Sequence, residues 1–390
     1  MEKRRNAVNT TPRVLFDATS IPPSHGGVAR FISGLLSGLE QNGEFVEVVA
    51  KRHDIPALHA VAPGHTYLVA PALVSLRGGR FLWEQTGLPA LARRRHADVI
   101  YSPHYTFPLA ARARRVVTLH DATFFSSPEA HSRLKGVFFR TWIRWANARA
   151  DRLVAASRAT ADEVQRYVAH AQSTIDVGYL GVDPAVFSPP TPEAIDTARS
   201  EIGLRPDQAW IAFLGTIEPR KNIPALIEAH AILRAADPTT PVLVLSGARG
   251  WDEAANDALD RNARLAPEDR PVIEAGYLPL ELLSAFLGGS DLVVYPSLGE
   301  GFGLPVLEAM SSGAAVLTTR RLSIPEVGGD AVEYTETDAA SIATRLSELL
   351  ADPERRAALA AAGLARSARF TWSECAAVYS RAFAEAGVSS

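Results

Sequence analysis

Residues 291–308 read DLVVYPSLGEGFGLPVLE, and this stretch decides the fold. Its first part, Asp291–Pro296, is an apolar run that predicts a buried parallel strand. Its last part predicts a helix, because Pro305 suits a first helical turn and an apolar stripe follows it. The glycine-rich turn between them would offer free backbone N–H groups to an anion. Glu300 on the loop and Glu308 about one turn into the helix add carboxylates, so the stretch predicts a ligand with both phosphate and hydroxyl groups.

The rest of the chain repeats this alternation of apolar strands and helices, which predicts an α/β protein with parallel sheets. At 390 residues it is too long for one ordinary core. The proline-rich segment 183–190 therefore predicts a hinge between a first domain, 1–190, and a second, 191–370, with a last helix at 371–388. The predicted strands are Val14–Phe16, Phe45–Val49, Asp98–Tyr101, Val116–Leu119, Arg152–Ala155, Thr174–Leu180, Trp210–Leu214, Val242–Leu245, Pro271–Glu274, Asp291–Tyr295 and Ala314–Leu317.

Ligands of open α/β sheets bind beyond the carboxyl ends of the strands. Polar and glycine-rich motifs follow several predicted strands in this way. They are Gly26-Gly27 after the first strand, His120-Asp121 after Val116–Leu119, Arg220-Lys221 after Trp210–Leu214, and Glu300 after Asp291–Tyr295. Two doubly wound domains that face each other would bring these motifs into one cleft.

Four motifs resemble those of one known family. They are the paired glutamates seven residues apart in residues 296–310, the loop Gly215–Asn222, the glycine loop Gly26–Arg30, and the segment Ser323–Ala331. The chain resembles glycosyltransferase family four, the large family of retaining enzymes with the GT-B fold, in which two Rossmann-like domains face across a cleft. The variant motifs look most like those of bacterial mannosyl- and rhamnosyltransferases of surface polysaccharide assembly. In that family the last helix crosses back onto the first domain.

Lys221 is one of only four lysines in a chain with 36 arginines. A compact ammonium suits a diphosphate oxygen in a tight loop, and the adjacent Arg220 adds a planar, bidentate donor. The alternative is an exposed basic pair, although the start of a helix is a poor place for cations. The resemblance implies that Arg220 and Lys221 neutralise the leaving nucleoside diphosphate. Thr216 stands where family members often carry arginine, and Arg220 is the candidate to replace it.

The resemblance also implies roles for the glycine-rich turn. Glu308 would accept hydrogen bonds from ribose hydroxyls, and Glu300 would accept them from hydroxyls of the donor sugar. The backbone N–H groups that would meet the donor belong to Gly301, Phe302, Gly303 and Leu304. The alternative for Glu300 is a carboxylate that serves only the helix dipole.

Each candidate site residue of the first domain has both a functional and a purely structural interpretation. His120 would lie near the donor sugar by resemblance and is our catalytic candidate together with Arg220, Lys221 and Glu300. A histidine at a strand end is also often structural. Gly27 is assigned to donor binding, and the acceptor side consists of Gly26, His104 and Asp121. The glycines could equally form a plain turn. Ser157 ends another strand and is a further cleft candidate.

The net charge of −3 hides an asymmetry. Residues 1–190 hold 23 of the 40 basic residues and 15 of the 43 acidic ones, which leaves them basic and the remainder acidic. Either the first half meets an anionic partner or the two domain faces match each other. Residues 131–150 contain five basic residues and no acid, with aromatics at helical spacing. They predict either a helix on an anionic membrane surface or a core helix with a solvated basic side.

The sequence does not favour a secreted or membrane-spanning protein, a metal site or a dinucleotide site. The single cysteine, Cys375, fits a reducing compartment, and neither a signal peptide in residues 1–6 nor a membrane span is predicted. We therefore expect a cytoplasmic protein, either free or peripheral at the inner face of the cell membrane. No Asp-x-Asp, zinc or Walker pattern is found, so we expect no metal and no cofactor. We also expect no nucleic-acid partner. Val306 replaces the last glycine of a dinucleotide fingerprint, which argues against an NAD enzyme.

The function expected from the resemblance is retaining transfer of a hexose, with mannose favoured. The donor would be a nucleotide-diphosphate sugar, with GDP-mannose favoured, and the acceptor a glycan or a polyprenyl-pyrophosphate-linked glycan of a surface polysaccharide such as lipopolysaccharide. Two alternatives stay open. One is a nucleotide-sugar epimerase on the same fold, and the other is a non-catalytic partner in a polysaccharide assembly complex. The residues leave the base, the linkage, the acceptor and the oligomeric state undetermined.

Overall fold

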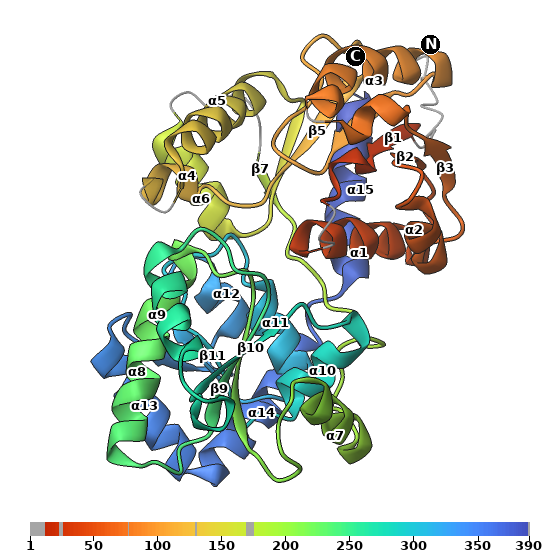
Figure 1. The fold of residues 1–390 in the computed structure, drawn as a ribbon. Coiled ribbons are helices and arrows are strands. Elements are labelled where there is room, and N and C mark those ends of the chain that lie inside the picture. The colour runs from red at the N-terminus through yellow and green to blue at the C-terminus, as the bar shows by residue number, and fades with distance from the viewer. Residues whose placement is uncertain (1–11, 23–25, 77, 129–130, 169–174, 389–390) are drawn as a thin grey trace, which may run out of the picture.

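The computed structural model describes residues 12–22, 26–76, 78–128, 131–168 and 175–388. Two parallel sheets, one from each half of the chain, are each packed against helices (Figure 1). The predicted α/β class with two doubly wound sheets is confirmed.

The first sheet has seven strands and the second has six, and every pairing within them is parallel. In spatial order the first contains β3 (Thr66–Val69), β2 (Glu47–Ala50), β1 (Val14–Asp17), β4 (Val99–Ser102), β5 (Arg114–Leu119), β6 (Arg152–Ala155) and β7 (Ile175–Val177). The second contains β10 (Val272–Gly276), β9 (Val242–Ser246), β8 (Trp210–Leu214), β11 (Leu292–Tyr295), β12 (Val316–Thr319) and β13 (Glu333–Thr335). The strand order reverses between β1 and β4 and between β8 and β11, which are the places where such sheets bind ligands.

Two strands, β3 and β13, were missed by the sequence prediction, and both lie at sheet edges. β3 (TYLV) is largely exposed and β13 (EYT) has only three residues, so neither forms the continuous apolar run that marks a buried parallel strand. Thr174, where the predicted strand 174–180 begins, lies outside the described residues, as do the charged residues 1–6.

The helices of the first half are α1 (Gly27–Gln41), α2 (Ile55–Val61), α3 (Gly79–Arg95), α4 (Thr123–Ser126), α5 (Arg133–Arg149) and α6 (Arg158–Tyr167). Those of the second half are α7 (Pro192–Glu201), α8 (Ile223–Ala236), α9 (Glu253–Ala263), α10 (Leu280–Gly288), α11 (Leu304–Ser311), α12 (Ile324–Gly328), α13 (Ala339–Ala351) and α14 (Pro353–Ser367). Short 3-10 helices span Ala18–Ser20, Ala72–Ser75, Pro219–Lys221 and Pro267–Asp269.

The last helix, α15 (Trp372–Val388), runs back along the first sheet and packs against α1 (Figure 1). Its approach is close, because a Cβ atom on Gly38 of α1 would lie 2.1 Å from the carbonyl oxygen of Trp372. The Tyr379 hydroxyl lies 3.1 Å from Thr118 Oγ1 of β5. The chain therefore passes between the halves twice, and the two passes are joined by a hydrogen bond from Val182 N to Phe370 O (3.0 Å).

Candidate active site

The loop after β8 places the predicted basic pair. Pro219 begins a 3-10 turn that ends at Lys221, and Asn222 then adopts a left-handed conformation with φ of 59°. The Asn222 side chain donates to the Pro296 and Thr337 carbonyl oxygens at 3.3 and 2.7 Å. This anchor ties the loop to the carboxyl end of β11, the strand from which Glu300 follows.

Glu300 is the centre of a buried polar cluster. Its Oε1 atom accepts hydrogen bonds from Lys221 Nζ (2.7 Å), Ser297 Oγ (2.6 Å) and the Tyr295 hydroxyl (3.1 Å). Its Oε2 atom accepts from Arg220 Nη1 (2.6 Å). Burial alone would raise the pKa of Glu300, but Arg220 and Lys221 outweigh it and lower that pKa to about 2. Glu300 is therefore a carboxylate at every physiological pH.

The two cations of this cluster differ in their surroundings. Lys221 is buried, and burial followed by the charge of Arg220 lowers its pKa. Its ammonium also contacts the Tyr295 hydroxyl. Arg220 is partly exposed and pairs through Nη2 with Glu218 Oε1 at 2.6 Å. In this structure two cations thus face two carboxylates.

Glu308 lies in α11 with only 1% of its surface exposed. Burial raises its pKa to about 7, although Arg30 of α1 opposes the rise. Arg30 Nε lies 2.7 Å from Glu308 Oε1 without acceptable hydrogen-bond geometry, and Arg30 Nη2 donates to Oε2 at a long 3.4 Å. We treat the contact as a charge pair with one weak hydrogen bond. The two residues come from opposite halves of the chain.

The glycine-rich turn lies against the first domain. A Cβ atom on Gly301 would lie 1.8 Å from the carbonyl oxygen of His120, so only glycine fits there. Thr160 Oγ1 of α6 donates to Gly301 O at 3.1 Å. Gly303 precedes α11 with φ of 99°. Among the described residues, no hydrogen-bond acceptor contacts the backbone N–H groups of Gly301, Phe302, Gly303 and Leu304.

His120 and His104 lie together at the carboxyl edge of the first sheet, with ring centroids 6.1 Å apart. His120 Nε2 lies 2.7 Å from the Pro103 carbonyl oxygen, which can only accept, so Nε2 carries the proton and Nδ1 is an acceptor. Burial lowers the pKa of His120. Burial, His120 and Arg80 lower the pKa of His104 to about 3. Both rings are neutral at pH 7.

The other candidates of the first domain are placed as follows. Gly26 is the N-cap of α1, and its carbonyl oxygen accepts from Arg30 N at 3.1 Å. Gly27 is the first residue of α1, and a Cβ atom there would meet nothing within 4 Å. Asp121 accepts from the backbone and hydroxyl of Thr123, a local turn at the start of α4. Ser157 is the N-cap of α6 and accepts from Thr160 N.

Several residues at this site were missed by sequence reasoning. Tyr295 and Ser297 complete the Glu300 cluster, and their signal was a polar side chain at the end of an apolar strand. Arg30 is the last residue of the Gly26–Arg30 motif, but the sequence did not indicate a role for it. Glu326 of α12 accepts from the backbone N–H groups of Arg158 and Ala159 at 2.9 and 2.7 Å, which caps α6 across the two domains. Arg30 and Glu326 are distant in sequence from the residues they contact, so no local pattern marks these two pairs.

A cavity of about 580 Å³ lies between the two halves beside the Arg30–Glu308 pair. Its lining is mainly apolar and comes from α1, from the two chain crossings and from the start of α10 and α11. It includes Ser33, Gly181, Phe187, Leu280, Leu304 and Trp372. A cavity of this size with few polar groups is typical of a small-molecule site.

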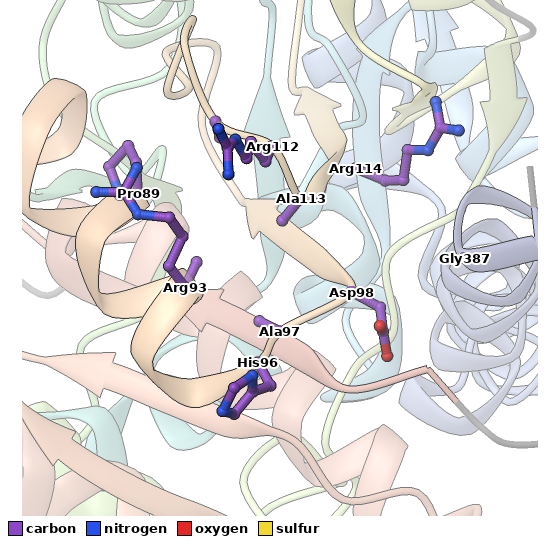
Figure 2. A pocket seen from close by; sticks show the side chains of 11 residues that line it. Pro89, Arg93, His96, Ala97, Asp98, Arg112, Ala113, Arg114 and Gly387 are labelled. Carbon is purple, nitrogen blue, oxygen red and sulfur yellow. The ribbon is translucent and has the colours of Figure 1, made fainter. Parts of the chain in front are cut away.

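A second hollow, of about 310 Å³, lies at the amino ends of β4 and β5 (Figure 2). Arg93, His96, Arg112 and Arg114 surround it, together with Asp98. The hollow lies at the amino ends of the strands, whereas His104, His120 and Asp121 follow the carboxyl ends of the same two strands. We therefore do not include it in the active site.

Over the described ranges, no three histidine, cysteine, aspartate or glutamate side chains are grouped so that they could hold a metal ion. Over the same ranges, no helix is both long and apolar enough to cross a membrane.

Two family models match the chain, "Glycosyltransferase Family 4" over residues 25–186 and "Glycosyl transferases group 1" over residues 194–366. One relative is the O-antigen chain mannosyltransferase B of Escherichia coli, which is 31% identical over 73% of this chain and 74% of that protein. Another is the D-inositol 3-phosphate glycosyltransferase of Mycolicibacterium smegmatis, which is 29% identical over 95% of this chain and 80% of that protein.

Among solved structures, HepE of Anabaena in complex with UDP and glucose has a TM-score of 0.71. It is 20% identical, and the match covers 95% of this chain and 99% of that one. At this identity the likeness shows the fold, and the predicted GT-B arrangement is confirmed. Taken together with the relative that is 31% identical over most of both chains, these matches show that the protein belongs to glycosyltransferase family 4.

Proposed function

We propose that this glycosyltransferase moves a hexose, most favourably mannose, from a nucleotide-diphosphate sugar to a glycan or lipid-linked acceptor with retention of configuration. The observation that carries the proposal is the cluster of Arg220 and Lys221 around Glu300, beside the free N–H groups of the turn before α11. Mannose is favoured because one of the relatives is called an O-antigen mannosyltransferase. The same name supports a role in surface polysaccharide synthesis and GDP-mannose as the first donor to test.

Departure of the nucleoside diphosphate is the step for which these residues are suited. Lys221 and Arg220 would stabilise the negative charge that grows on the leaving phosphate, and fixed donors act strongly where water is excluded. The N–H groups of the four residues 301–304, which have no acceptor among the described residues, would add to this. Glu300 would hold both cations in place. Its Oε2 atom has only Arg220 as a partner among the described residues, which leaves a lone pair for a hydroxyl of the donor sugar.

The nucleoside would lie at Glu308 and in the adjoining cavity. An ionised Glu308 can accept hydrogen bonds from both ribose hydroxyls, and the apolar lining near Leu280 and Leu304 suits a base. Gly27 would let the start of α1 approach the donor.

The acceptor would enter from the first domain, where Gly26, His104 and Asp121 lie. In a front-face reaction, the departing phosphate removes the proton of the acceptor hydroxyl while the new bond forms on the side from which it leaves. His120 would hold a donor hydroxyl through Nδ1 and would place its carbonyl oxygen near the reacting centre. Positioning of both substrates then supplies much of the rate.

An anionic membrane surface is the proposed setting for a lipid-linked acceptor. The outer side of α5 and the adjacent part of α3 form a basic–apolar surface. Its exposed members are Phe81, Leu82, Arg133, Leu134, Val137, Phe138, Arg144, Trp145 and Arg149, and Leu134 is 83% exposed. Phe81 and Phe138 are in ring contact, so the two helices present one continuous face. Basic helices with exposed apolar residues bind anionic lipid.

The transfer proposal is tested by calorimetry with GDP, UDP and ADP, followed by turnover with the sugar nucleotide of the base that binds. GDP binding and mannose transfer from GDP-mannose to a lipid-linked glycan acceptor are expected, and the anomeric configuration of the product is read by NMR. An inverted product would contradict retention. Turnover of the nucleotide sugar without an acceptor would instead support an epimerase, which the transferase names of the relatives do not favour.

The cofactor proposal is that no metal takes part. Activity should therefore persist in excess EDTA. Loss of activity in EDTA that magnesium or manganese restores would contradict it.

The membrane proposal is tested by sedimentation with phosphatidylglycerol and phosphatidylcholine vesicles. Binding to the anionic vesicles alone, weakening with salt, is expected, because each basic side chain near such a surface contributes about 1 kcal/mol. The double variant Arg133→Glu, Arg149→Glu should lose it. Arg140 is unsuitable for this test because it donates to Phe124 O at 2.8 Å. The control is Arg261→Glu, Arg264→Glu, which makes the same charge change at the carboxyl end of α9. No binding by the parent protein would overturn the proposal.

A further inference from the structure

Arg30 holds Glu308 from across the domain boundary, and the two residues differ in their access to water. The Glu308 side chain is 1% exposed, whereas the Arg30 side chain is 24% exposed. Among the described residues, Arg30 is the only partner of the Glu308 carboxylate. A buried carboxylate that loses its only partner is strongly destabilised. Arg30 can therefore leave only when other hydrogen-bond donors take its place.

The geometry of the pair is poor enough to permit this exchange. The shorter contact, from Nε to Oε1, does not align as a hydrogen bond, and the aligned contact from Nη2 is 3.4 Å long. Two vicinal hydroxyls of a ribose supply two donors to the same two oxygen atoms. A hydroxyl pair with normal geometry would replace one long hydrogen bond with two good ones.

The charge balance of the neighbouring loop suggests a second binding partner for the Arg30 side chain, the donor diphosphate. Arg220 and Lys221 are already matched by Glu218 and Glu300, so the loop after β8 has no surplus positive charge of its own. An incoming diphosphate brings at least two negative charges into this site. Arg30 is the cation that becomes unpaired when a ribose takes Glu308. It lies in the first turn of α1, and a Cβ atom on Gly26, the cap of that helix, would be 4.0 Å from the Tyr277 hydroxyl of the second domain.

We propose that Arg30 is a positioning residue that holds Glu308 in the unliganded protein and moves onto the donor diphosphate when the ribose binds Glu308. About one helical turn, roughly 5 Å, separates Glu308 from the turn before α11. The swing thus couples recognition of the ribose to neutralisation of the phosphates. The inference rests on the proposed binding of a nucleoside at Glu308.

The test compares binding of a nucleoside with binding of the corresponding nucleoside diphosphate. Calorimetry at pH 8.5 measures the affinities of guanosine and GDP, or of uridine and UDP if that base binds. The proteins compared are the parent, Arg30→Gln, Arg30→Lys and the control Arg94→Gln, which makes the same substitution at an exposed arginine of α3 outside the cavity. In Arg30→Gln the ratio of diphosphate to nucleoside affinity should fall at least tenfold, while the nucleoside affinity stays level or rises. Arg30→Lys should retain part of the ratio, and Arg94→Gln should retain all of it.

Each other result overturns the inference. An unchanged ratio in Arg30→Gln means that Arg30 never reaches the phosphates. An equal loss for both ligands means that it binds the nucleoside or supports the fold, and thermal unfolding distinguishes these two causes. If neither ligand binds the parent protein, the proposed function fails and this inference fails with it, whereas normal GDP binding with an unchanged ratio rejects the inference alone.

Discussion

At the scale of single residues, the site is governed by burial and charge pairing. Glu300 and Glu308 are both buried carboxylates, yet their pKa values lie on opposite sides of the ordinary value, at about 2 and about 7. The difference follows from their partners, because Glu300 is next to two cations and Glu308 has one loosely aligned arginine. The two glutamates of one motif therefore differ in protonation behaviour, which agrees with the different roles that we propose for them.

Lys221→Met should lower transfer at least ~100-fold, because a buried donor to a developing charge contributes roughly 3 kcal/mol. Methionine keeps the volume of the side chain, and Glu300 keeps its contacts with Arg220, Tyr295 and Ser297, so the fold should survive. Steady-state kinetics and thermal unfolding measure the two effects. Lys135→Met, which removes an exposed lysine, is the control. Near-normal turnover in the folded Lys221 variant would reject the diphosphate role.

Nucleotide affinity should depend on pH through Glu308. Its pKa of about 7 means that it is protonated below pH 7 and then accepts hydrogen bonds poorly. Affinity should therefore fall by up to about tenfold per pH unit below pH 7 and level off above it. Calorimetry from pH 5.5 to 8.5 checks this.

Glu308→Gln should weaken binding and remove this pH dependence. Glu300→Gln should keep the dependence, because the pKa of Glu300 is about 2, and should mainly lower turnover. A pH dependence that survives in Glu308→Gln would assign the titration to another group.

At the scale of elements, the turn before α11 serves both domains. Among the described residues its N–H groups have no hydrogen-bond acceptor, while Gly301 lies against the backbone of His120 at the end of β5. Ser323 Oγ donates to Glu300 O at 2.7 Å, and Glu326 caps α6. The loops after β11 and β12 therefore join the halves as well as shaping the site.

Gly301→Ala should lower turnover by roughly 100-fold, because a Cβ atom 1.8 Å from His120 O forces the two domains apart at the reacting centre. The domains themselves should remain folded. Kinetics and thermal unfolding are the measurements. Gly299→Ala is the matched control, since its Cβ atom would lie 2.8 Å from a methyl group of the flexible Leu322 side chain and 3.8 Å from the Thr123 methyl group, and would meet no backbone atom within these distances. Full activity in Gly301→Ala would show that this contact is not needed.

At the scale of the whole molecule, α15 completes the first domain with residues from the end of the chain. Trp372 lies over Gly34 and Gly38 of α1, and the Tyr379 hydroxyl contacts the Thr118 hydroxyl of β5 in the first sheet. The second chain crossing is thus anchored beside the cavity that Glu308 faces. The position of the two domains depends on this helix.

Gly38→Ala should lower the free energy of unfolding by ~1–3 kcal/mol, because its methyl group would overpack against the Trp372 backbone at 2.1 Å. Denaturant unfolding measures the change. Gly27→Ala, on the same helix, adds a methyl group into open space and should leave stability nearly unchanged. Equal stability of the two variants would contradict the close docking of α15.

The amino-acid sequence by itself determined the α/β class, most strand positions and the glycine-rich turn with its two glutamates. These features are local, because a buried parallel strand and a helix start each leave a pattern within about ten residues. Tertiary structure alone decided the edge strands β3 and β13, the Tyr295–Ser297 support of Glu300, the Arg30–Glu308 pair and the Glu326 cap. The Arg30–Glu308 pair and the Glu326 cap join residues far apart in the chain, whereas Tyr295 and Ser297 are near Glu300 in sequence and reach it only through the conformation of the folded loop. The pKa values of the two glutamates follow from burial and charge pairing that only packing creates.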